Sequence, residues 1–139
     1  MGGAGLAARL AALILLDFEA IRAYQAAIRE APAELRAGLA SLMADHEEHA
    51  RVLVAQAAQA GGRPPTARDI QGRFFWAPKG AEKPLGGLLA MEEEAVSAYE
   101  ATCQMPAGAS LAEILGRFAA DERRHLEWLR GRLGPRGGR

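Results

Sequence analysis

The chain has 139 residues, of which 50% are hydrophobic and 24% are charged, values typical of one soluble globular domain. Its formal net charge is zero, so the composition gives no reason to expect a nucleic acid or an anionic membrane as a partner. The single cysteine, Cys103, excludes an intrachain disulfide, a four-cysteine iron site and a CxxC redox motif, and it favours a reducing, cytoplasmic compartment.

Four stretches show helical periodicity and few helix-breaking residues, so the sequence predicts an all-α fold. The apolar run from Leu6 to Leu16 is similar to a secretion signal, but Arg9 and Asp17 interrupt it and no basic segment precedes it. We therefore interpret this run as the start of the first helix. The expected helices cover residues 5–30, 33–60, 85–104 and 111–133.

The connections between these helices are short, long and short. The long one covers residues 61–84 and contains the aromatic run from Arg73 to Trp76. A connection of this length is typical of a crossover that runs along a bundle with its aromatic side chains packed on the surface. The pattern predicts a single domain, a four-helix bundle of two antiparallel hairpins in the order up-down-down-up. The alternative, a disordered linker between two dimerising hairpins, fits the aromatic run less well.

A two-part pattern occurs twice along the chain. Each copy has a carboxylate seven residues before a tyrosine and, on the next helix, an aspartate four residues before a histidine. Two such copies can bring four sets of ligands to one axis, as a two-metal site inside a four-helix bundle requires. The copies are Asp17 and Tyr24 with Asp45 and His49, and Glu92 and Tyr99 with Asp121 and His125.

Helical periodicity indicates which ionisable side chains face inward. At about 100° per residue, Asp17 and Glu92 lie in the middle of the apolar faces of their helices, whereas Glu19 and Glu94 point away from them. The apolar face that contains Glu92 also contains Cys103, which we expect in the core. Burying many ionisable groups would cost several kcal/mol per ion, and two divalent metals would supply the missing positive charge. The inward set is Asp17, Asp45, His46, His49, Glu92, Asp121, Glu122 and His125.

These motifs make the chain resemble the ferritin-like superfamily, in particular bacterioferritin and the diiron domain of rubrerythrin. The segment from Asp17 to Tyr24 is similar to the Glu-x-x-Ala-Ile-x-x-Tyr pattern of the first helix in bacterioferritins, with Asp in place of Glu. The segment from His46 to Ala50 is similar to Glu-x-x-His-Ala in the second helix. The segment from Asp121 to Leu129 is similar to Asp-Glu-Glu-x-His-x-x-Trp-Leu in the last helix.

The resemblance implies two irons per chain and a role for each residue of the set. The implied metal ligands are Asp17 and Glu92 as terminal carboxylates, Glu122 as a bridge, and His49 and His125 as one histidine for each metal. The implied neighbours of these ligands are Asp45 and Asp121, which orient the histidines, and Tyr24 and Tyr99, which hydrogen-bond the ligand carboxylates and are the candidate catalytic side chains.

Three residues depart from the family pattern. His46 stands where the second bridging glutamate is expected and is itself a candidate ligand, and Asp17 is one methylene shorter than the usual glutamate. The loss of a bridging carboxylate removes a negative charge and a link between the metals. The alternatives are therefore a more asymmetric pair, a single metal, or zinc or manganese in place of iron. Glu47 occupies the place of the haem-binding methionine, so no haem is expected.

The resemblance implies redox chemistry in which Fe(II) reacts with O2 or peroxide, as in a ferroxidase or a peroxidase. One alternative is a non-catalytic protein that binds or delivers metal and in which His46 suppresses O2 activation. The other is a metal-free structural bundle. Apolar side chains expected on outer faces predict a homodimer or a larger homo-oligomer; they include Leu15, Leu16, Met43 and Val54.

Overall fold

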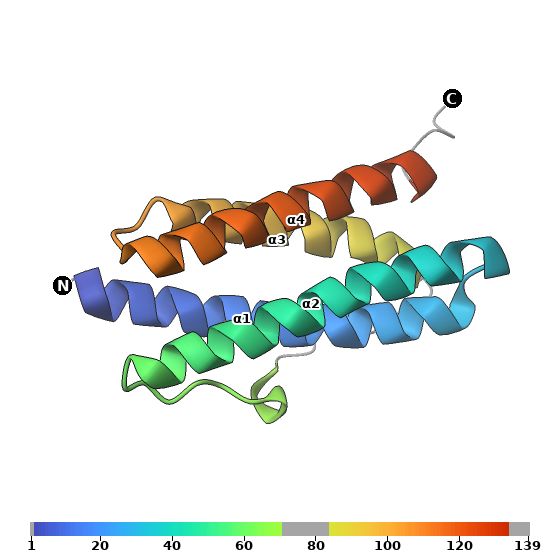
Figure 1. Cartoon of the computed structure of the whole chain (residues 1–139). Helices are drawn as coiled ribbons and strands as arrows, with labels where there is room; N and C mark the ends of the chain where they lie inside the picture. Colours follow the sequence, from blue (N-terminus) through green and yellow to red (C-terminus); the bar gives the residue numbers. More distant parts are fainter. Residues whose placement is uncertain (1, 71–83, 134–139) are drawn as a thin grey trace.

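The computed structural model describes residues 2–70 and 84–133. Their secondary structure consists of four long helices and one short 3-10 helix, so the predicted all-α four-helix fold is confirmed (Figure 1). The elements are α1 (Gly2–Glu30), α2 (Ala33–Gln59), η1 (Ala67–Asp69), α3 (Pro84–Cys103) and α4 (Ala109–Leu133).

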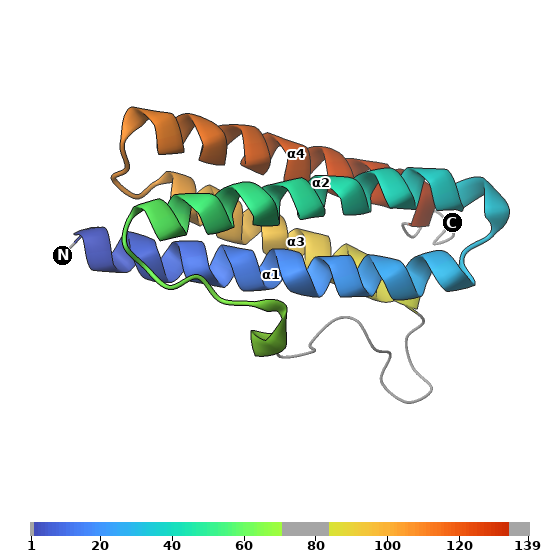
Figure 2. The same cartoon turned by 60° about the horizontal axis from the view of Figure 1, so that its bottom comes forward.

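The helices form two antiparallel hairpins, α1 with α2 and α3 with α4 (Figures 1 and 2). Helix α1 packs against both α2 and α3, and α3 packs against α4, whereas contact between α2 and α4 is sparse. The end of α2 and the start of α3 lie at opposite ends of the bundle (Figure 2). This is the up-down-down-up order that the short, long and short connections predict. The expected crossover lies partly outside the described residues, and its aromatic run from Arg73 to Trp76 lies wholly outside them.

Helix α2 has well-defined ends. Pro32 precedes its first residue with extended backbone angles and accepts a hydrogen bond from the Leu35 amide at 3.0 Å. At the other end, Gly61 has a φ of +87°, in the left-handed region that favours glycine. The amides of Gly61 and Gly62 then donate to the carbonyls of Ala58 and Ala57, each at 3.0 Å, which is a Schellman motif. These ends fix the length of the helix that carries both candidate histidines of the first hairpin.

Two apolar clusters fill the bundle, one on each side of a polar layer. On α1 the boundary is visible in the sequence, since Ile14 belongs to one cluster, Ala20 to the other, and the buried Asp17 lies between them. The first cluster consists of Leu10, Leu13, Ile14, Leu53, Tyr99, Leu115, Phe118 and Ala119. The second consists of Ala20, Ala23, Tyr24, Ala27, Ala31, Leu39, Leu88, Met91 and Leu129. The polar layer is therefore separated from water at both ends of the bundle.

Three predictions of burial on α1 and α3 were wrong. Glu19 and Leu16 were expected on outer faces but are 1% and 4% exposed. The reason is that α1 contacts α2, α3 and η1, so more than one of its faces is covered. Cys103 was expected in the core but is exposed, because it is the last residue of α3.

The other outward apolar residues, Leu15, Met43 and Val54, are half-buried.

Among the described helices, none combines the length and the hydropathy that crossing a membrane requires.

Candidate metal centre

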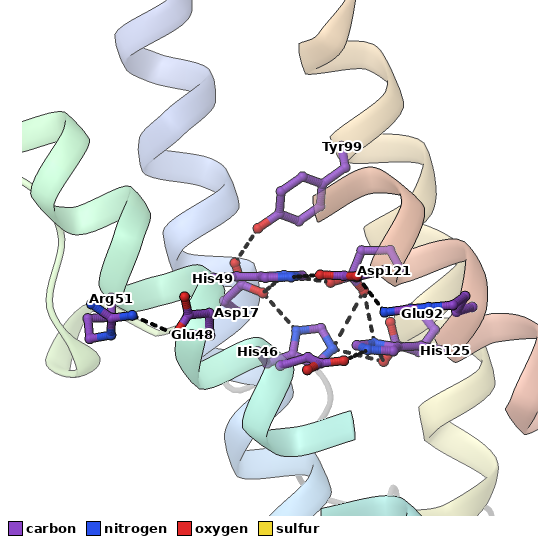
Figure 3. Close-up of polar contacts among 12 residues, drawn as sticks. Asp17, His46, Glu48, His49, Arg51, Glu92, Tyr99, Asp121 and His125 are labelled. Atoms are coloured by element: carbon purple, nitrogen blue, oxygen red, sulfur yellow. Dashed lines mark hydrogen bonds and ion pairs between the residues drawn. The ribbon is translucent and has the colours of Figure 1, made fainter. Parts of the chain in front are cut away.

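Six of the eight inward residues come together in the polar layer, and all four helices contribute to it (Figure 3). Helices α1 and α3 contribute one carboxylate each, α2 contributes two histidines, and α4 contributes one carboxylate and one histidine. Each of these side chains is at most 1% exposed. The six are Asp17, His46, His49, Glu92, Glu122 and His125.

The six residues form two overlapping groups of four. In each group, one nitrogen or carboxylate oxygen from every residue lies within 4.8 Å of the others. The two groups share His46 and Glu122. The group that we call the Asp17 position consists of Asp17, His46, His49 and Glu122. The group that we call the Glu92 position consists of His46, Glu92, Glu122 and His125.

The imidazole of His46 lies between the two positions. Its Nδ1 is 2.7 Å from Asp17 Oδ1. Its Nε2 is 2.8 Å from Glu92 Oε2 and 3.5 Å from Glu122 Oε1. The ring therefore spans the carboxylates of α1 and α3, in the place where the resemblance predicts a second bridging carboxylate (Figure 3).

The other two histidines each use one ring nitrogen for a carboxylate at the edge of the bundle. His49 Nε2 is 2.9 Å from Asp121 Oδ2, and His125 Nε2 is 2.8 Å from Asp45 Oδ2. Asp121 and Asp45 are 28% and 38% exposed, so both lie at the surface. The prediction that both aspartates face the interior was therefore wrong, although each pair crosses between α2 and α4 as the resemblance implied. Each pair leaves the Nδ1 atom of its histidine facing the interior. This arrangement is common around metal-binding histidines, where the second nitrogen donates to a carboxylate that fixes the tautomer.

The two tyrosines hydrogen-bond the two carboxylates that the resemblance implies as terminal ligands. The Tyr99 hydroxyl donates to Asp17 Oδ2 at 2.6 Å, and the Tyr24 hydroxyl donates to Glu92 Oε2. Both rings are buried in the apolar clusters that border the polar layer. Each terminal carboxylate is thus fixed by one tyrosine from the other hairpin.

Several buried polar atoms around this layer have no hydrogen-bond partner among the described residues. Glu122 Oε2 and His49 Nδ1 are 2.9 Å apart, but the contact lacks hydrogen-bond geometry. Unsatisfied buried groups are costly, and a cation at the two positions would be their natural partner. The donor set of carboxylate oxygens and imidazole nitrogens suits iron, zinc or manganese, so these residues fit a metal. The atoms are His49 Nδ1, His125 Nδ1, Glu92 Oε1 and both carboxylate oxygens of Glu122.

Without a metal, the histidines are the cations of the cluster. Burial disfavours the charged form of His49, but the carboxylates of Asp17 and Glu122 outweigh it and raise its pKa to about 10. Burial acts on His125 in the same way, and Glu122 and Glu92 raise its pKa to about 9.

The pKa values of His46 and Glu92 also reflect the opposing effects of burial and of neighbouring charges. Burial disfavours the charged form of His46, yet Glu122 and Glu92 raise its pKa well above the usual value. Burial also opposes ionisation of Glu92, yet the charge of His46, the close approach of His125 and the hydrogen bond with His46 lower the pKa of Glu92. Metal binding therefore has to displace protons from imidazoles, and these protons keep the metal-free cluster close to neutral.

The aromatic ring of Phe118 also borders the polar layer. The Phe118 ring stacks on His49, with centroids 3.9 Å apart and planes inclined by 22°. Phe118 precedes Glu122 by one helical turn, so helical periodicity places it on the face of α4 that carries the site, and only its stacking on His49 could not be predicted. Glu47 and Glu48 are exposed, and Glu48 pairs with Arg51 at the surface (Figure 3).

Comparisons with known proteins agree with this architecture at the level of the fold. No protein-family model and no curated protein sequence matches the chain. A similar solved structure is the crystal structure of ferritin-like, diiron-carboxylate proteins from Bacillus anthracis strain Ames, with a TM-score of 0.83 and 23% sequence identity. The match covers 96% of this chain and 98% of that chain. The chain therefore has a ferritin-like fold, as the sequence predicted.

Proposed function

We propose that this ferritin-like chain is a metalloprotein that binds iron at the Asp17 and Glu92 positions and oxidises Fe(II) with O2 or peroxide. The observation that carries the proposal is the cluster of six buried ligand-type side chains, which form two groups and share His46 and Glu122. The similar structure from Bacillus anthracis is described as a diiron-carboxylate protein, which supports iron as the metal.

The residues around the cluster have separable roles in this proposal. When bound, two Fe(II) ions would supply two electrons, which with two protons reduce one peroxide to two waters. Asp45 and Asp121 orient His125 and His49, so that their Nδ1 atoms face the metal positions. Tyr99 and Tyr24 hold the terminal carboxylates in place and are the nearest oxidisable side chains. The two apolar clusters exclude bulk water from the layer.

A surface cavity offers access for a small oxidant. It has a volume of about 500 Å³ and lies between α2 and α4, where helix contact is sparse. Its lining includes His125 and Asp45, so it reaches the hydrogen-bonded pair at the edge of the Glu92 position. O2 and peroxide are small enough to use such a path without a large conformational change.

A non-catalytic protein that binds or delivers metal is the second candidate function. The placement of His46 favours it, because an imidazole between Asp17 and Glu92 replaces the carboxylate that would otherwise link the two metals. His46→Glu separates the two candidates. If His46 suppresses oxidation, as the binding or delivery function requires, the variant oxidises Fe(II) faster than the wild-type protein. If the two proteins oxidise Fe(II) at similar rates, the redox function is supported.

The proposal also includes a cytoplasmic location and a homodimer or larger homo-oligomer. The exposed thiol of Cys103 suits a reducing compartment, and the half-buried Leu15, Met43 and Val54 could complete their burial against a second copy. Light scattering coupled to gel filtration measures the assembly directly, and a monomer at micromolar concentration would contradict this part.

The redox activity is tested by stopped-flow absorbance with anaerobically loaded protein. We expect O2 or peroxide to oxidise bound Fe(II) faster than free Fe(II) in the same buffer. Glu122→Ala should abolish the effect, because Glu122 belongs to both positions. Glu48→Ala, an exposed change on α2, should leave it intact. Equal rates for wild type and Glu122→Ala would refute the proposed activity.

A further inference from the structure

We infer that the two metal positions are unequal, and that His46 makes the Glu92 position the tight one. In this arrangement His46 binds metal through Nε2, together with Glu92, Glu122 and His125, and donates its Nδ1–H to Asp17. The Asp17 position then fills second and more weakly. This inference rests on the proposed function, because it requires that the cluster binds metal.

The chemistry of the imidazole ring sets the asymmetry. A neutral imidazole has one nitrogen with a free lone pair and one N–H, whereas a carboxylate has lone pairs on both oxygens. A glutamate in this place could serve both metals at once. His46 offers one ring nitrogen to each position, so as a neutral ring it can be a ligand at only one of them.

The other two histidines each have one ring nitrogen on an aspartate and the other free for a metal, and His46 can adopt the same arrangement. His49 and His125 each have Nε2 on an aspartate and Nδ1 toward the interior. His46 has an aspartate at the opposite nitrogen, with Nδ1 2.7 Å from Asp17 Oδ1. With Nδ1–H on Asp17, all three histidines donate to an aspartate and offer the remaining nitrogen to a metal.

Distances between the candidate ligand atoms favour the Glu92 position. A tetrahedral metal with bonds of about 2.0–2.1 Å places its ligands about 3.3–3.4 Å apart. At the Glu92 position, His125 Nδ1 lies 3.3 Å from Glu92 Oε2 and 3.5 Å from Glu122 Oε1. His46 Nε2 lies 2.8 Å and 3.5 Å from the same two oxygens. Three of these four distances are close to the spacing that a tetrahedral metal requires, and His46 Nε2 and Glu92 Oε2 would have to move slightly apart.

The Asp17 position is less regular. His49 Nδ1 lies 2.9 Å from Glu122 Oε2 but 3.8 Å from Asp17 Oδ1, while His46 Nδ1 lies 2.7 Å from that same Asp17 oxygen. With Nδ1–H donated to Asp17, three residues remain to bind metal there. A metal at this position therefore has fewer ligands and needs more rearrangement of them.

The net charge of the polar layer also favours one bound metal over two. The layer contains three carboxylates, from Asp17, Glu92 and Glu122, and these more than neutralise one divalent ion. Two divalent ions carry four positive charges, which exceeds the three negative charges by one. In a buried site the uncompensated charge disfavours the second ion.

Cobalt(II) titration of the metal-free protein tests the inference, with visible absorbance and elemental analysis after gel filtration as readouts. We expect the wild-type chain to retain one cobalt, and to take up a second only at free cobalt concentrations at least about tenfold higher. Asp17→Asn should still bind the first cobalt, with at most about a 10- to 100-fold loss of affinity, since its amide oxygen accepts the His46 N–H more weakly than the carboxylate does. Glu92→Gln, the matched isosteric change, should lose it. His46→Glu should retain two.

Each outcome supports or refutes a specific statement. Two cobalt ions with equal affinity in the wild-type chain would overturn the inference and leave the proposed metal centre standing. Equal loss of the first cobalt in Asp17→Asn and Glu92→Gln would also overturn it. No retention of cobalt, iron or zinc by folded wild-type protein would overturn both the inference and the proposed function. The wild-type titration requires no variant, so a misfolded variant does not remove the test.

Discussion

A hydrogen bond between His125 Nε2 and Asp45 Oδ2, 2.8 Å long, joins α4 to α2 across the least extensive helix contact of the described bundle. The pair formed by His49 and Asp121 repeats this link in the opposite direction, at 2.9 Å. A duplicated sequence pattern thus becomes a duplicated structural feature. In both cases a surface aspartate of one hairpin orients a buried histidine of the other.

Asp45→Asn and Asp121→Asn should therefore weaken metal binding without removing a ligand. An amide accepts a weaker hydrogen bond than a carboxylate does, so the histidine is less firmly oriented. We expect a loss of about 10- to 100-fold in cobalt or zinc affinity for each variant, measured by competition with a chelator. Glu48→Gln is the control, because its carboxylate is exposed and pairs with the exposed Arg51. Wild-type affinity in both aspartate variants would contradict the orienting role.

The stability of the metal-free protein should fall as the pH rises from about 6.5 to 10. The pKa of His49 rises from 6.5 to about 10 in the folded state, and that of His125 rises from 6.5 to about 9. The folded state then binds more protons than the unfolded state across this window. The stabilisation is complete below pH 6.5 and disappears as the pH passes through 9 to 10.

Urea unfolding at several pH values, with a chelator present, measures this dependence. The unfolding midpoint should decline steadily above pH 6.5. An increase over the same range would show that the histidines are neutral in the folded protein. Saturating metal should reduce the decline, because bound metal replaces the protons as the source of positive charge.

Helical periodicity alone was enough to predict the four helices and the burial of the carboxylates of Asp17 on α1 and Glu92 on α3. Asp17 and Glu92 interrupt otherwise apolar helical faces, and this pattern is visible without knowledge of the neighbouring helices. It could not show that Glu19 is buried, because burial there depends on how many elements cover α1. It also could not show that His46 contacts both Asp17 and Glu92, since this depends on the register between three helices.

The two tyrosines should have different effects on the first metal. Tyr24→Phe removes the hydrogen bond to Glu92, which we infer to be a ligand at the tight position, whereas Tyr99→Phe removes the bond to Asp17. A hydrogen bond to a charged group contributes about 1.5–3 kcal/mol, so both changes should lower the free energy of unfolding measurably. Only Tyr24→Phe should also weaken binding of the first cobalt. Equal weakening by both variants in the cobalt titration would contradict this distinction.

Gly38 on α2 lies against Trp128 on α4, and the contact leaves no room for a side chain. A methyl group at Gly38 would lie 2.2 Å from Trp128 Cζ2, so the indole, which also contacts Arg132, would have to move. We expect Gly38→Ala to destabilise the protein by about 1–3 kcal/mol and to change tryptophan fluorescence.

Gly116→Ala on α4 is the matched control for this change. Apart from its chain neighbours and the backbone of its own helix, no atom of the described residues lies within 4 Å of the position where its methyl group would be, and the residue is inside the helix. We expect this variant to be more stable by about 0.5–1 kcal/mol. If both alanine variants were stabilising in urea unfolding, the close packing of Trp128 on Gly38 would not be present in solution.

Anomalous diffraction from crystals loaded anaerobically with Fe(II), collected at the iron absorption edge, tests the metal centre most directly. The expected result is a strong peak surrounded by His46, Glu92, Glu122 and His125, with a weaker peak at the Asp17 position. Crystals that contain iron by fluorescence but show no peak between the four helices, or only peaks at surface carboxylates, would contradict the account.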